Sequence, residues 1–89
     1  MNRTEFLDGV EKILNEINIW GLEIRREDPA IVVEGGRQML IWLCKDLFDY
    51  DNERKTKLDH FLVYFEIAID FEEGYISLFM KPEYFEKMI

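Results

Sequence analysis

The side chains best suited to covalent chemistry in this sequence are its one cysteine and its one histidine, Cys44 and His60. A thiol beside an imidazole can act as a nucleophile when a third group orients the imidazole. Nothing in the spacing of these two residues brings them together, and no orienting group is implied. We therefore interpret Cys44 as a buried thiol and His60 as a residue at a strand edge, and we predict that the protein is not an enzyme.

A second chemical pattern is a short alternation of acids in the polar stretch 46–57: Asp49, Asp51 and Glu53. A calcium-binding loop beginning at the first of these acids needs glycine at its sixth position and a bidentate acid at its twelfth. Those positions hold Arg54 and His60. We therefore interpret the stretch as a charged, solvated loop, and we expect neither a metal nor any other cofactor.

The composition is that of a small globular protein. The chain has 89 residues, of which 48% are hydrophobic and 15% aromatic, so we predict a single domain over 1–89. A single cysteine cannot form an internal disulfide, and the N-terminus shows no apolar signal-peptide segment. We therefore expect a cytoplasmic location. No apolar run reaches the length of about 18 residues that a membrane span needs.

The charge of the chain is strongly negative. Nineteen acids against eleven bases give a formal net charge of −8. Direct binding to nucleic acid or to an anionic membrane depends on Lys and Arg, so this balance argues against both. The charge either keeps the protein soluble or presents a surface that imitates phosphate and occupies a basic groove on a partner.

The stretch 60–81 predicts a long β-hairpin, because apolar residues alternate with other residues along it with the period of a strand. The apolar set of its first arm consists of Phe61, Val63, Phe65, Ile67, Ile69 and Phe71. A two-residue turn at Glu73-Gly74 would place Phe71 opposite Ile76 and keep the apolar residues of both arms on one face. Pro82 would then end the second arm.

The rest of the chain predicts elements that cover this hairpin. A helix should begin near Asn2 or Thr4, with an apolar stripe that consists of Phe6, Leu7, Val10, Ile13, Leu14 and Ile17. Residues 22–27 and 30–34 are strand-like and are joined by a turn at Asp28-Pro29. Residues 83–89 can form one or two helical turns after the proline.

The segment 37–48 is ambiguous. Its Leu, Met, Gln and Lys content and an apolar stripe favour a helix. The Gly35-Gly36 pair after 30–34 resembles a hairpin turn, and on this ground we expect a further strand. The fold class that follows is α+β: an N-terminal amphipathic helix packed on a mostly antiparallel sheet of four or five strands, with a short C-terminal helix.

The outward face of the hairpin is the candidate site. It interleaves aromatic rings with carboxylates, and we expect a protein-binding surface that consists of Tyr64, Glu66, Asp70, Glu72, Glu73, Tyr75 and Phe79. A second layer, such as 37–48 folded as a helix, would instead bury it. The function we expect is a small acidic module that binds a partner with a basic surface, as an inhibitor that blocks a nucleic-acid-binding site. The alternative is a self-assembling subunit, for instance a homodimer formed through this face or a sheet edge.

Overall fold

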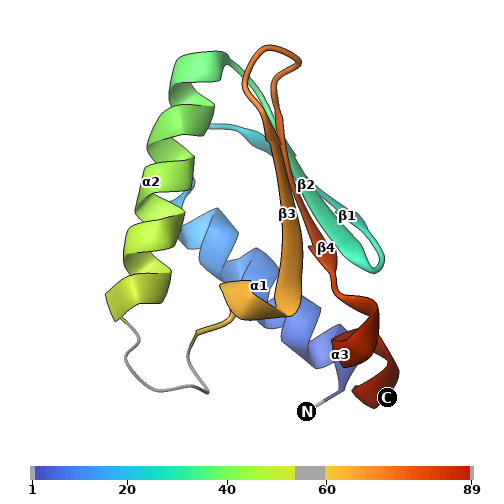
Figure 1. The fold of residues 1–89 in the computed structure, drawn as a ribbon. Helices are drawn as coiled ribbons and strands as arrows, with labels where there is room; N and C mark the ends of the chain where they lie inside the picture. Colours follow the sequence, from blue (N-terminus) through green and yellow to red (C-terminus); the bar gives the residue numbers. More distant parts are fainter. Residues whose placement is uncertain (1, 54–59, 89) are drawn as a thin grey trace.

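The computed structural model describes residues 2–53 and 60–88 of the chain (Figure 1). Its elements are α1 (Arg3–Ile17), β1 (Glu23–Glu27), β2 (Ala30–Glu34), α2 (Arg37–Glu53), the short 3-10 helix η1 (Leu62–Tyr64), β3 (Phe65–Asp70), β4 (Tyr75–Met80) and α3 (Pro82–Lys87). The four strands form one antiparallel sheet in the order β1-β2-β4-β3. The predicted α+β fold is confirmed.

The molecule has two layers. In Figure 1 the long helices α1 and α2 lie on the same side of the sheet, and α3 lies at its lower end. The core between the layers is apolar and includes Leu7, Val10, Leu14, Ile31, Val33, Leu40, Leu43, Leu47, Phe65, Ile76, Leu78 and Met80. Each strand contributes alternate residues to this core, which leaves its other residues on the opposite face of the sheet.

The N-terminal helix begins as the capping pattern predicts. The Asn2 side chain accepts a hydrogen bond from the Glu5 backbone N–H at 2.8 Å, and its amide donates to the Glu5 carboxylate at 3.2 Å. These contacts satisfy a backbone donor that a helix start leaves without an intrahelical partner. The helix ends at Ile17, and Gly21 lies four residues beyond this end with φ of +72°.

The expectation of a strand at 37–48 is wrong, because these residues belong to α2. The helix buries Leu40, Leu43 and Leu47, which recur at the spacing of one helical face. A hairpin from β2 into this segment is also excluded by the sheet, since β2 already pairs with β1 on one side and β4 on the other. The described part of the expected 46–57 loop is helical as well, and the remainder of that stretch lies outside the described residues.

The hairpin of β3 and β4 has a longer turn than the two residues predicted. Asp70 lies opposite Tyr75, so residues 71–74 form the turn and the register differs from the prediction by two positions. A shift of two keeps the residues of β3 and β4 on their predicted faces. Asp70 explains the difference: its carboxylate accepts the backbone N–H groups of Glu72 at 3.0 Å and Glu73 at 2.9 Å. Gly74 N–H donates to the Asp70 carbonyl at 2.8 Å.

The first arm of the hairpin is also shorter than predicted, because η1 replaces its beginning. Phe61 and Leu62 are still buried, whereas Val63 is 48% exposed and does not belong to the covered face. The turn into η1 is held by Asp51 near the end of α2. This carboxylate is only 8% exposed, and it accepts the backbone N–H of Leu62 at 3.3 Å.

We therefore expect Asp51→Ala to lower the free energy of unfolding by about 1–2 kcal/mol, because a buried donor loses its acceptor. Asp49→Ala is the matched control, since Asp49 lies on the same helix and is exposed. Urea denaturation of both variants measures the difference. Equal losses of unfolding free energy in the two variants would show that the Asp51 contact does not stabilise the turn into η1.

Candidate functional site

The outer face of the sheet is the surface that the two long helices leave open. Both helices pack on the other face (Figure 1), and no helix among the described residues lies over the outer one. Strand alternation and the pairing register place these residues on it: Glu23, Arg25, Glu27, Ala30, Val32, Glu34, Glu66, Ala68, Asp70, Tyr75, Ser77 and Phe79. The layer that would have buried the candidate site therefore covers the opposite face instead.

Phe79 is the main apolar side chain of the outer face. It lies between Ala30 of β2 and Glu66 of β3 in the register, and it is 45% exposed although it belongs to a central strand. Tyr75, further along the same strand face, is half-buried between Glu34 and Asp70. An exposed ring on a rigid central strand is a suitable anchor for a protein partner, because little conformational entropy is lost on binding.

The charges of the outer face are unevenly compensated. Arg25 pairs with the Glu34 carboxylate at 2.7 Å and with that of Glu27 at 3.0 Å, so two carboxylates share one cation on the β1 side. The hydrogen bonds to these two carboxylates raise the pKa of Arg25. Within the described part of the chain, Glu66 makes no ion pair. At the turn, Glu72 lies 3.4 Å from the exposed Arg37 guanidinium. Both sides of the outer face therefore keep a net negative charge, and on the β3 side Glu66 lies beside Phe79.

Six of the seven predicted site residues lie on this face or at its end. Glu66, Asp70, Tyr75 and Phe79 belong to the outer face, and Glu72 and Glu73 lie in the adjoining turn. Tyr64 does not join them. It belongs to η1, where its ring lies 5.2 Å from that of Phe6 and 4.6 Å from that of Tyr84. Tyr64 thus links α1 and α3 in the core region, because the 3-10 turn breaks the strand alternation before Phe65.

Sequence reasoning missed an apolar surface on the helical layer. Trp42 and Met39 of α2 are 43% and 44% exposed, and the Trp42 ring lies 4.7 Å from that of Trp20. Met39 and Trp42 are three residues apart, which places them side by side on a helix. This pattern indicates a shared surface only if 37–48 is helical. These side chains are uncharged, so they do not select a class of partner as the acidic outer face does.

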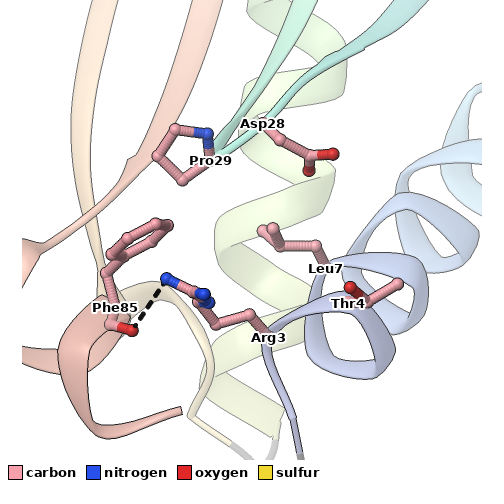
Figure 2. A pocket seen from close by; sticks show the side chains of 6 residues that line it. All are labelled: Arg3, Thr4, Leu7, Asp28, Pro29 and Phe85. Carbon is pink, nitrogen blue, oxygen red and sulfur yellow. Dashed lines mark hydrogen bonds between the residues drawn. The ribbon is translucent and has the colours of Figure 1, made fainter. Parts of the chain in front are cut away.

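A small cavity of about 200 Å³ lies where α1, the β1–β2 turn and α3 meet, and Figure 2 shows its lining. Its charged groups are already engaged. Arg3 donates to the Phe85 carbonyl at 3.4 Å and its guanidinium lies 3.8 Å from the Phe85 ring centre, while Asp28 pairs with Arg26 at 2.6 Å. The cavity is smaller than the roughly 300–1,000 Å³ of typical ligand pockets. We interpret these contacts as the attachment of α3 to the domain.

Cys44 and His60 show no sign of activation. Cys44 is half-buried, and burial raises the pKa of its thiol, which reduces the reactive thiolate at neutral pH. The His60 Nε2 atom is buried and has no hydrogen-bond partner among the described residues.

Within residues 2–53 and 60–88, no group of three or more His, Cys, Asp or Glu side chains could hold a metal ion. No described helix is long and apolar enough to cross a membrane.

We expect Cys44 and His60 to be dispensable for partner binding. Cys44→Ala should cost some packing energy and His60→Gln little, and the Cys44 thiol should react with iodoacetamide more slowly in the folded than in the urea-unfolded protein. Binding assays on the two variants and mass spectrometry of the alkylated protein provide the measurements. A loss of activity in both variants without loss of folding would contradict the non-enzymatic interpretation.

Comparisons of the chain with protein families, with curated proteins and with solved structures found no match.

Proposed function

We propose that this protein is a non-enzymatic protein-binding module whose outer sheet face docks on a basic surface of a larger protein. The observation that supports the proposal is the position of Phe79, 45% exposed on a central strand and next to Glu66, whose charge has no partner among the described residues. A stiff ring can enter an apolar pocket while the carboxylates steer toward cations.

The most specific form of the proposal is inhibition of a nucleic-acid-binding protein. A net charge of −8 and a row of carboxylates resemble the charge of a nucleic-acid backbone, so the face would compete for a groove that binds phosphate. The partner can be captured from cell extract on the immobilised protein at low salt and eluted at high salt, because salt screens the steering charges. Titration of this protein should then release nucleic acid from the captured partner.

The charge part of the proposal has a direct test. The triple variant Glu66→Gln/Glu72→Gln/Glu73→Gln should slow association with the captured partner roughly tenfold at low salt and flatten the salt dependence of the rate. The matched control, Glu16→Gln/Glu53→Gln/Glu86→Gln, removes the same charge from exposed positions outside the outer face. Stopped-flow or surface-based kinetics measure both. Equal slowing by the two variants would mean that net charge is responsible and this face is not.

The second candidate function is a self-assembling subunit. It is favoured by two exposed apolar residues of the outer face, Phe79 and Ala68, which lie on neighbouring strands. Such a subunit would bury this surface against a second copy. Light scattering across a range of concentrations separates the candidates, because a dimer that persists on dilution supports assembly.

A further inference from the structure

The two edges of the sheet are protected to different degrees. On β1, the Arg26 side chain points toward the helices, where its guanidinium donates to Asp8 at 2.8 Å and to Asp28 at 2.6 Å. Burial opposes the charge of Arg26, but the hydrogen bonds to these two carboxylates hold its pKa above the usual value. An inward-pointing charge is one of the devices that keep an edge strand from pairing with another chain. Arg26 therefore protects the β1 edge against strand addition.

On β3, the residues that point toward the helices, Phe65, Ile67 and Ile69, carry no charge. This strand pairs with β4 in an unbroken register from Phe65 to Asp70, and no described segment pairs with its other side. Alternate backbone N–H and C=O groups on that side therefore lack a strand partner. Ile69 points toward the helical layer but is 39% exposed, and Ile67 is only half-buried. A strand added here would gain backbone hydrogen bonds and cover both apolar side chains.

The charges of β3 determine which strand can be added. On its outer face, Glu66 and Asp70 flank Ala68. If two copies of β3 paired with Ala68 opposite Ala68, each Glu66 would lie opposite an Asp70, and the neighbouring registers that preserve the faces leave acids opposite or diagonal to acids. Like charges in these positions are destabilising. A second copy of the chain is thus disfavoured, and cations opposite Glu66 and Asp70 are favoured.

We propose that the edge of β3 binds an extended segment of the partner in which Lys or Arg alternates with apolar residues. The inference rests on the proposed function, since it identifies the element of the basic partner that is recognised. Backbone pairing supplies affinity, the cations of the segment face Glu66 and Asp70, and its apolar residues cover Ile67 and Ile69. The outer face with Phe79 continues directly from this edge through the β3–β4 pairing.

The test uses a short synthetic peptide of alternating lysine and valine, with blocked ends, added to the full-length protein. Amide hydrogen exchange measured by NMR should slow at Ile67 and Ile69, whose N–H groups point away from β4, and remain unchanged along β1. A peptide of the same composition with its valines grouped together should bind at least about tenfold more weakly, because only alternation matches the two faces of a strand. Equal binding of the two peptides would overturn the proposal.

Charge reversal provides the matched variants. Glu66→Lys should weaken binding of the alternating peptide roughly tenfold, since it replaces an opposite-charge pair with a like-charge pair. Glu23→Lys makes the same change at an exposed position on the β1 edge and should leave the affinity unchanged. Equal weakening by the two variants would show attraction by net charge without strand addition, which contradicts the proposal.

The outcome also separates this inference from the proposed function. Peptide-induced shifts at Tyr75 and Phe79 without slowed exchange in β3 would overturn strand addition and leave docking on the outer face supported. Slowed exchange in β3 without effect at Phe79 would support strand addition and count against the ring as an anchor. Dimerisation through β3 in the absence of peptide would overturn the choice of a basic segment as the occupant.

Discussion

Replacing Gly74 with valine is expected to lower the free energy of unfolding by at least about 2 kcal/mol. Two features of the position cause the loss. Its φ of +83° is a conformation that β-branched residues rarely adopt, and an added Cβ would lie 2.8 Å from the Gly35 carbonyl oxygen. Gly35 is also bonded to the turn, because its backbone N–H donates to the Gly74 carbonyl at 3.1 Å. Thermal and urea denaturation of the variant measure the effect.

The matched control is Gly21→Val. Gly21 also has a positive φ, +72°, but an added Cβ there meets no atom within 4 Å. Gly21→Val should therefore lower the free energy of unfolding only through backbone strain. The additional loss in Gly74→Val measures the contact between the β3–β4 turn and the β2–α2 junction. Equal stability of Gly74→Val and the unmodified protein would contradict the turn described for this hairpin.

The hairpin shows how far the sequence determines the fold. Alternation assigned Ile67, Ile76 and Leu78 to the core face correctly, because side-chain direction depends only on the period of two. Alternation cannot choose between registers that differ by two residues, since both keep the same faces. The choice is made by the Asp70 carboxylate, which accepts two backbone N–H groups of the turn and so favours four residues over two.

The strand predicted for 37–48 is wrong for a different reason. The apolar residues of this segment fit both the helical and the strand period, and the Gly35-Gly36 pair favours a strand while the helix propensities favour a helix. The Gly35-Gly36 pair does not form a hairpin turn, and an added Cβ at Gly35 would require the end of the Leu22 side chain to shift. Once α2 is helical, Leu40, Leu43 and Leu47 complete the core and the outer face stays open. The exposure of the candidate site thus depended on a tertiary contact that local sequence does not encode.

Within the candidate site, sequence reasoning succeeded where the strand was regular. Glu66, Tyr75 and Phe79 share a face because they lie inside β3 and β4 with the expected alternation. Tyr64 lies before the regular strand, and its ring packs with Phe6 and Tyr84. The aromatic contacts that draw Tyr64 inward join elements far apart in the sequence, so no local pattern reports them.

The role proposed for Phe79, an anchor for a partner on the outer face, can be tested by comparing the dissociation kinetics of two variants. Phe79→Ala and Phe48→Ala remove the same ring from exposed positions, 45% and 38% exposed, in the sheet and helical layers respectively. Buried aromatic anchors mainly set the rate of dissociation, and a hot-spot residue contributes about 2 kcal/mol or more. Phe79→Ala should therefore speed dissociation of the captured partner roughly 30-fold, and Phe48→Ala should leave it unchanged. Equal dissociation rates for the two variants would contradict the assignment of the outer face as the binding surface.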